Sequence, residues 1–181
     1  IDLDEWQDIY IVNGYVNENT QPARESNQFF RNDKGKTFID ETDQVGMTMF
    51  AETDAYTYVD FDNDGDLDIA AVESLGPVWI NVNNGTENNG ISIELRDDYG
   101  NSFGVGSSVT VSYGDKGSKQ QIREVQASGG FLSHDAPQVH FGLGKAASIS
   151  KIRIDWSTGE TTELNGNFAA GKRYRINRNG L

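Results

Sequence analysis

Five aspartates lie within the nine residues from Asp60 to Asp68, and this run carries the clearest chemical pattern of the sequence. Counted from Asp60, aspartates occupy positions 1, 3, 5 and 9, with Gly65 at position 6. Carboxylates at alternate positions of a tight loop converge on one point, and Ca²⁺ takes about six to eight oxygen ligands. Glycine permits the sharp turn that such a loop needs. The spacing therefore predicts a calcium site. Its expected ligands are the carboxylates of Asp60, Asp62, Asp64 and Asp68, completed by a backbone carbonyl near Asp66 and by water.

Strands are expected on both sides of this loop, which separates it from an EF-hand. An EF-hand loop needs a glutamate at position 12 and a helix on each side. Position 12 here is Ala71, and residues 55–59 and 69–72 have the composition of β-strands. A solvated acidic turn is the plain alternative, because most charge runs are exposed faces. We expect the ion to have a structural role, pinning the chain where it enters a strand.

An internal repeat predicts a second, weaker calcium loop at the start of the chain. Residues 2–12 superimpose on residues 62–72 at an offset of 60. Three aspartates coincide, but Glu5 stands where the second copy has Gly65. The counterpart of Asp60 falls before residue 1, so the chain is expected to begin inside a calcium loop. The predicted ligands of this truncated loop are Asp2, Asp4 and Asp8.

The strand and turn signals predict an all-β protein, and 181 residues suffice for one large or two small domains. Residues 1–85 contain the aspartate loops, each followed by strand-like segments, as in a partial β-propeller. From about residue 91 short alternating segments take over, which indicates a β-sandwich over residues 91–181. We place the boundary in the Gly/Asn-rich segment Asn83–Gly90. The expected strands of the second part are 91–96, 108–113, 120–126, 138–141, 151–156, 161–164 and 173–177.

Composition argues against several classes of protein. The net charge is −13, with 28 acidic and 15 basic residues, so nucleic acids and anionic membranes are poor partners. The absence of cysteine rules out disulfides and thiolate metal sites. No apolar run approaches the roughly 18 residues of a membrane span, so membrane insertion is not expected. The N-terminus lacks the pattern of a signal peptide, so we expect either a removed leader or a fragment.

Two stretches of the chain resemble known families. The repeated aspartate loop resembles the FG-GAP (VCBS) repeats of integrin-like β-propellers. The second part looks like an ASPIC/UnbV domain, and the run Ser128–Gly144 carries the most specific part of this resemblance. The other matching segments are 104–111, 121–125 and 152–159. The two stretches together, in this order, resemble the C-terminal part of the cartilage acidic protein family and its bacterial homologues.

The resemblance implies a secreted, extracellular, calcium-binding module for adhesion or protein interaction, with no established catalytic activity. The chain departs from the family pattern at His134, where the family usually has Gln, and at Ser157, where it usually has Pro. It also holds only about one and a half blades of a propeller. The implied partner is another protein or a second copy of the chain, with a glycan as an alternative.

Other residue groups admit catalytic interpretations. His134, Asp135 and His140 could form a zinc or acid–base cluster. However, His140 lies in an apolar run, where packing or a hydrogen bond within a sheet is the better explanation. A pair of carboxylates could serve a glycoside hydrolase, yet calcium explains the loop aspartates better. We therefore expect no enzyme. Arg123 is expected to form an ion pair with Glu124 or a cross-strand acid.

Two further functions stay open beside the interaction module. Unpaired strand edges would let copies of the chain assemble into a fibre or ring. Exposed tryptophan and tyrosine side chains would serve a carbohydrate-binding module. The sheet faces and the polar loop Tyr15–Ser26 are the candidate contact surfaces.

Overall fold

The computed structural model describes residues 1–13, 26–50, 53–62, 64–73, 76–98 and 100–179. In this part of the chain thirteen strands form four sheets, and the one helical element is a 3₁₀ turn at Asp115–Gly117. The all-β class predicted from the sequence is thereby confirmed. Within the same residues, no helix has the length and apolarity that a membrane span requires. The proposed contact loop Tyr15–Ser26 lies outside the described residues, except for Ser26.

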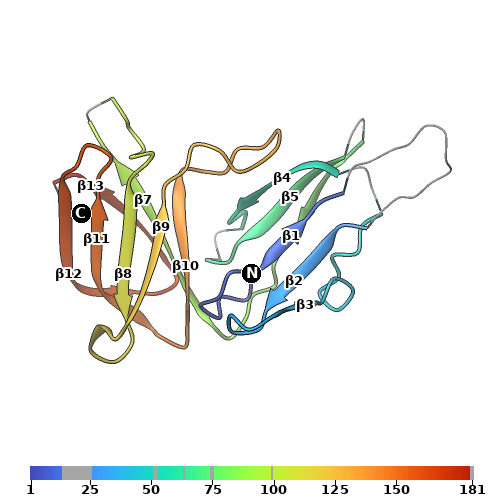
Figure 1. Cartoon of the computed structure of the whole chain (residues 1–181), viewed down its shortest axis with the longest axis horizontal. Helices are drawn as coiled ribbons and strands as arrows, with labels where there is room; N and C mark the ends of the chain where they lie inside the picture. The colour runs from blue at the N-terminus through green and yellow to red at the C-terminus, as the bar shows by residue number, and fades with distance from the viewer. Residues whose placement is uncertain (14–25, 51–52, 63, 74–75, 99, 180–181) are drawn as a thin grey trace.

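The N-terminal half consists of two antiparallel three-stranded sheets (Figure 1). The first sheet has the strand order β1 (Ile9–Ile11), β2 (Gln28–Asn32), β3 (Phe38–Asp40). The second has the order β4 (Thr53–Val59), β5 (Asp68–Glu73), β6 (Val78–Asn81). Each sheet follows the chain as a simple meander. Residues 1–8 lead into β1, and residues 60–68 lead into β5, so each aspartate loop precedes an apolar strand as predicted.

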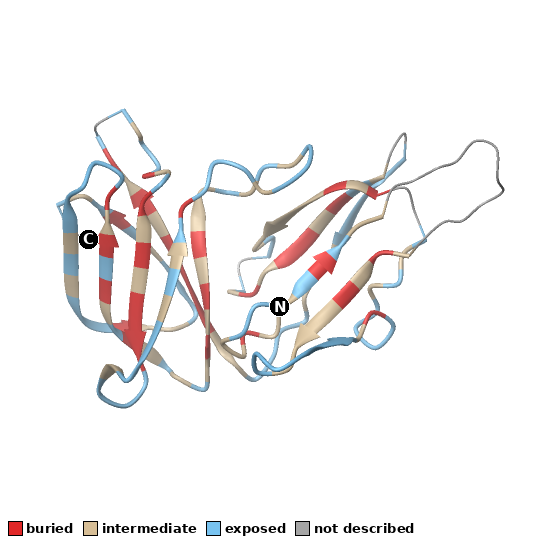
Figure 2. Ribbon diagram, in the orientation of Figure 1, coloured by how far each residue is buried: buried red, intermediate tan, exposed pale blue. Residues whose placement is uncertain are grey.

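Few side chains hold these two sheets together. The buried members of their shared core are Tyr10, Phe29 and Ile69. The rings of Tyr10 and Tyr56 meet edge to face with centroids 5.3 Å apart, and Tyr56 meets Tyr58 in the same way at 5.3 Å. Figure 2 shows that β3, at the edge of the first sheet, is exposed along its whole length. This half therefore depends on contacts outside its own small core.

The C-terminal half is a β-sandwich of seven strands. One sheet has the order β10 (Gln138–Gly144), β7 (Asn89–Arg96), β13 (Lys172–Asn177), in which β7 and β13 run parallel. The other sheet has the order β12 (Thr161–Ala169), β11 (Ser148–Asp155), β8 (Ser108–Tyr113), β9 (Lys119–Glu124). β7 starts at Asn89, inside the Gly/Asn-rich segment proposed as the boundary.

Alternation along these strands supplies a large apolar core. Ile91, Ile93 and Leu95 on β7 face the interior at every second position, and each is at most 1% exposed. Val109 and Val111 do the same on β8. Sixteen buried residues form this core, against three in the core of the N-terminal half. Burying one large apolar side chain contributes about 1.5–3 kcal/mol, so the sandwich holds most of the hydrophobic stabilisation of the molecule.

The halves meet where β9 and β10 border the N-terminal sheets. The first aspartate loop lies against β10, and the backbone N–H of Gly144 donates to the carbonyl of Leu3 at 2.9 Å. The loop between β9 and β10, which connects the two sheets, projects from the sandwich toward β4 (Figure 1). There the Thr57 hydroxyl donates to Oδ1 of Asp135 at 2.7 Å. Both aspartate loops lie at this junction.

Candidate metal centre

The backbone of the loop 60–68 is held by hydrogen bonds to the carboxylates of the loop itself. The backbone N–H of Asp64 donates to Oδ1 of Asp62 at 3.2 Å, and that of Asp66 donates to Oδ1 of Asp64 at 2.9 Å. Gly65 has a φ of +98°, in the left-handed region that side chains rarely adopt. The sequence therefore folds locally as its spacing predicts, with glycine at the position where the backbone needs it.

Three carboxylates of this loop converge. Asp60, Asp62 and Asp68 each place one oxygen so that all three atoms lie within 4.8 Å of one another. Oδ1 of Asp60 is buried without a hydrogen-bond partner, and the Asp60 side chain is only 9% exposed. An unpaired carboxylate oxygen away from water is costly, and nearby like charges repel. A hard cation at the point of convergence would satisfy this oxygen, so the residues present fit calcium.

Asp68 is held rigidly at the base of the loop. Its Oδ2 accepts the backbone N–H of Phe61 at 2.7 Å, and its Oδ1 accepts that of Asn83 at 2.8 Å. These two bonds tie the start of the loop, the start of β5 and the turn after β6 to one carboxylate. Each oxygen keeps a second lone pair for a cation. Asp68 therefore acts as the anchor of the site as well as a candidate ligand.

Asp64 and Asp66, the other two predicted ligands, lie outside the converging group of described carboxylates. Asp64 is exposed, and its Oδ1 accepts the Asp66 N–H. The Asp66 carboxylate points toward the turn after β6, because a Cβ added to Gly85 would be 2.9 Å from its Oδ2. Burial raises the pKa of Asp66, and the negative charges of Asp64 and Asp60 raise it further.

The internal repeat seen in the sequence recurs in the hydrogen bonds. In the first loop the N–H of Asp4 donates to Oδ1 of Asp2 at 3.1 Å, as Asp64 does to Asp62. Oδ1 of Asp8 accepts the N–H of Asn32 at 2.9 Å, as that of Asp68 does from Asn83. The two loops thus share these hydrogen bonds, 60 residues apart in the sequence.

The first loop differs from the second in its side chains. Glu5, which replaces the glycine, keeps the left-handed conformation with a φ of +85°. The predicted ligands Asp2, Asp4 and Asp8 do not form a converging group like that of the second loop, among the carboxylates that the structure describes.

The first loop packs between the two halves of the molecule. Leu3 is buried against β10, where a Cβ on Gly142 would be 2.8 Å from the Leu3 backbone. The Glu5 carboxylate binds the ammonium of Lys119 on β9, with N···O distances of 2.6 and 2.7 Å. The carbonyl of Asp2 accepts a bond of 2.8 Å from the side chain of Asn88. The segment proposed as a linker is therefore bonded to this loop.

The second loop also contacts the sandwich. Nε2–H of His140, on β10, donates to the carbonyl of Gly65 at 2.9 Å. Nη2 of Arg173, on β13, lies 3.7 Å from Oδ2 of Asp60. Burial lowers the pKa of His140, and the bond to Gly65 partly offsets this effect. Sequence reasoning missed both contacts. The apolar run Val139-His140-Phe141 favoured packing or a hydrogen bond within a sheet, whereas the structure places the bond of His140 on the aspartate loop of the other half.

The histidine cluster considered for catalysis is not assembled. Among the described residues, His134, Asp135 and His140 do not form a group that could hold a metal. Oδ1 of Asp135 instead accepts the N–H of Tyr58 at 3.1 Å, in addition to the bond from Thr57. Asp135 thus attaches the β9–β10 loop to β4.

The expected ion pair of Arg123 is also absent, because no described carboxylate lies within 4.0 Å of its guanidinium. Its neighbour Glu124 follows on the opposite face of β9, as strand alternation requires. The prediction for Arg123 was therefore wrong.

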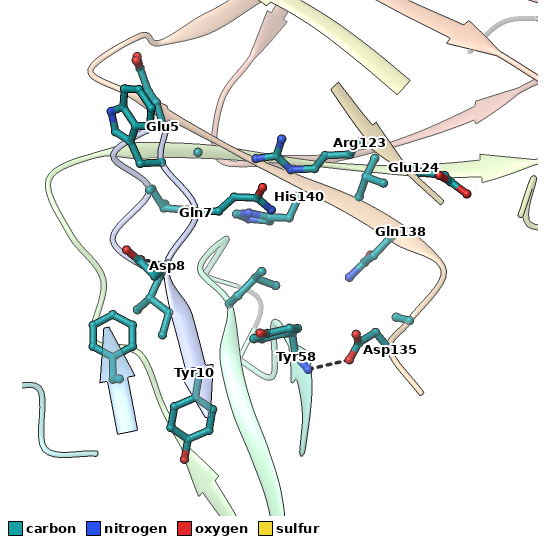
Figure 3. A pocket seen from close by; sticks show the side chains of 18 residues that line it. Glu5, Gln7, Asp8, Tyr10, Tyr58, Arg123, Glu124, Asp135, Gln138 and His140 are labelled. Atoms are coloured by element: carbon teal, nitrogen blue, oxygen red, sulfur yellow. Dashed lines mark hydrogen bonds and ion pairs between the residues drawn. The ribbon is translucent and has the colours of Figure 1, made fainter. Parts of the chain in front are cut away.

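A cleft of about 290 Å³ remains between the halves (Figure 3). Its walls are the first aspartate loop, the end of β4, and the strands β9 and β10. Polar and aromatic side chains dominate it, including Trp6, Tyr58, Arg123 and His140.

Comparison with known proteins bears on the C-terminal half. Residues 97–180 match the family model described as ASPIC and UnbV. The match begins directly after β7 and covers the other six strands of the sandwich. This match supports the resemblance noted for the second part of the sequence, over residues 97–180. No curated protein matches the chain.

Proposed function

We propose that this chain is an extracellular calcium-binding module for adhesion or protein interaction, without catalytic activity. The observation that carries the proposal is the buried, partnerless Oδ1 of Asp60, which converges with oxygens of Asp62 and Asp68. A protein-interaction role is what an ASPIC and UnbV domain suggests in general. The repeat of the aspartate loop supports the view that the N-terminal half derives from propeller blades.

Calcium would act by stabilising the junction. The same loop that holds Asp60 presents its Gly65 carbonyl to His140, so an ordered loop favours docking onto the sandwich. Extracellular sites of this kind have dissociation constants of about 0.1–1 mM. At millimolar calcium one such site stabilises the folded state by about 0.4–1.4 kcal/mol. That amount is useful where the local core has only three buried residues.

The β9–β10 loop is the candidate contact surface for a partner. Phe131 and Leu132 at its tip are 78% and 76% exposed, the highest values among the large apolar side chains described as exposed. Leu132 has a φ of +51°, which is unfavourable for a branched side chain. The bonds of Asp135 to β4 fix the base of this loop. An apolar tip on an anchored base fits insertion into a concave protein surface.

Asp60→Asn tests the calcium site. We expect calcium to raise the melting temperature of the wild-type chain relative to EGTA, and this increment to disappear in Asp60→Asn. The reason is that the amide keeps the shape but loses the charge that the cation requires. The matched control is Asp98→Asn, which removes the same charge from an exposed position beyond β7. An Asp60→Asn variant that keeps the full increment, or loses equal stability in both buffers, contradicts the site.

A second candidate is a structural subunit that assembles through a strand edge. β6 is the outer strand of its sheet, and Val78, Trp79 and Ile80 are 62%, 43% and 46% exposed. No charged residue lies between Val78 and Val82. Charged residues normally protect sheet edges from pairing with another chain, so this edge favours the addition of a strand.

A further inference from the structure

The cleft between the halves combines aromatic side chains, amides, four carboxylates and one guanidinium. Tyr58 comes from the N-terminal half, and Gln138, His140 and Arg123 come from the sandwich (Figure 3). Trp6, also from the N-terminal half, lines the cleft as well. The arrangement requires both halves, so neither family resemblance predicts it. At about 290 Å³ it is at the lower end of the range for small-ligand pockets.

Arg123 is the exceptional residue of this cleft. The structure describes seven arginines, and six have a carboxylate partner within 4.0 Å. The paired ones are Arg31, Arg96, Arg153, Arg173, Arg175 and Arg178. In a chain with 28 acidic and 15 basic residues, an arginine without a carboxylate partner is unexpected. Arg123 is the one that faces the cleft.

Three of the four acids that line the cleft are engaged elsewhere. Glu5 is bound to Lys119, Asp8 accepts the N–H of Asn32, and Asp135 is bonded to β4. The fourth, Glu124, is exposed and lies more than 4.0 Å from the Arg123 guanidinium. Among the described residues Arg123 therefore has no carboxylate partner, and its guanidinium lies over the Phe141 ring, 5.5 Å from the centroid.

The Arg123 guanidinium is held in place and still has donors to spare. Nη2 donates to Oε1 of Gln121 at 3.1 Å, and Nη1 donates to the carbonyl of Ile122 at 2.9 Å. Gln121 is itself fixed by bonds to Tyr113 and to the Gly142 carbonyl. A guanidinium carries five N–H donors, so a ligand can still be bound. Burial lowers the pKa of Arg123, because the charged form loses solvation.

We propose that the cleft binds an acidic sugar, with the carboxylate of a single uronate residue on Arg123. Arginine recognises carboxylates by paired hydrogen bonds. Trp6 and Tyr58 offer rings for a sugar to stack on, and Gln138 and the engaged acids offer hydrogen-bond partners to its hydroxyls. A densely charged polymer does not fit, because the chain has a net charge of −13. This ligand goes beyond the proposed calcium-dependent interaction.

Titration calorimetry of the full chain in millimolar calcium tests this proposal. The probes are a disaccharide ending in glucuronate and the same disaccharide ending in glucose. We expect the wild-type chain to bind the first at least tenfold more tightly. Arg123→Gln should abolish that preference. The matched control is Arg175→Gln, which removes the same charge from an exposed, ion-paired position on β13 and should keep it.

Further probes distinguish a sugar carboxylate from other carboxylates, and a conservative variant shows whether a loss of binding comes from misfolding. Acetate and a short peptide with a free C-terminal carboxylate should each bind at least tenfold more weakly than the glucuronate probe. Arg123→Lys, which keeps the charge but not the paired geometry, should retain folding and lose most of the affinity. Equal binding of both sugars, equal binding of the peptide, or an unchanged preference in a folded Arg123→Gln chain would overturn the proposal. No binding of the glucuronate probe by the wild-type chain would overturn it as well.

Discussion

At the residue scale, Glu5 and Gly65 show how one backbone conformation serves two purposes. Both lie in the left-handed region, with φ values of +85° and +98°. For a residue with a side chain this conformation costs about 1–2 kcal/mol. Glu5 tolerates it while its carboxylate binds Lys119 across the junction. The first loop therefore has the same left-handed conformation at this position as the second loop. The side chain of Glu5 at this position contacts the sandwich.

His140 makes the stability of the chain depend on pH. Burial lowers its folded-state pKa below the ordinary value, while the unfolded chain keeps about 6.5. Below about pH 6.5 the unfolded state therefore binds more protons, and stability falls as the pH decreases. We expect His140→Gln, which can still donate to the Gly65 carbonyl, to flatten this part of the profile. Urea unfolding between about pH 5.5 and 8 measures it.

His134→Gln is the control for this prediction. His134 is exposed in the β9–β10 loop, next to Asp135, so its replacement should leave the pH dependence in place. An unchanged slope in His140→Gln would show that other groups produce it.

At the element scale, the first aspartate loop docks on a strand that lacks a side chain at the point of contact. Gly142 lies at a register shift in β10, directly beneath Leu3. Gly144 then donates its N–H to the Leu3 carbonyl at 2.9 Å. Two glycines on one strand thus let a loop backbone approach a sheet edge to within hydrogen-bond distance.

Gly142→Ala should loosen this docking. The new Cβ would be 2.8 Å from the backbone of Leu3, and backbone cannot move aside as a flexible side chain can. Overpacking of this kind costs about 1–3 kcal/mol. Thermal unfolding and limited proteolysis of residues 1–8 report the loss. Gly166→Ala on β12 is the matched control, because its Cβ would meet only the Phe168 side chain at 3.4 Å. Equal effects of the two substitutions would contradict the docking role.

At the scale of the whole molecule, a well-packed sandwich stabilises a weakly packed N-terminal half. The sandwich buries sixteen core residues, while the two N-terminal sheets share three. The N-terminal half compensates through the aspartate loops and Asp135, which bond it to β9, β10 and β13. Its outer strands β3 and β6 keep exposed apolar side chains.

Self-association through β6 is a prediction about the whole molecule. If this edge accepts a second chain, size-exclusion chromatography with light scattering should show oligomers that grow with concentration. Ile80→Lys should return the chain to a monomer, because a charge on an edge strand opposes pairing. Ile122→Lys is the control, since Ile122 is 61% exposed on β9, an edge strand of a different sheet. A monomer at every concentration would exclude assembly through this edge, and the interaction module would stand alone.

The sequence by itself determined the local features of this protein. The spacing of Asp60, Asp62 and Asp68 around Gly65 predicted a loop whose carboxylates converge, and alternation predicted the strands to within a few residues. Both follow from neighbours in the chain, where backbone geometry and the side-chain period set the outcome. Asp64, the fourth expected carboxylate ligand, lies outside the converging group of described residues.

Only the tertiary structure decided what the loops and charges face. Whether Asp60 keeps an oxygen without a partner, whether His140 meets Gly65, and whether Arg123 finds a carboxylate all depend on segments far apart in sequence. The register of β10 against β7, and the docking of the first loop on β10, place these groups together. Sequence spacing sets the order of side chains along a strand, but the packing of whole sheets sets which side chains share a cleft.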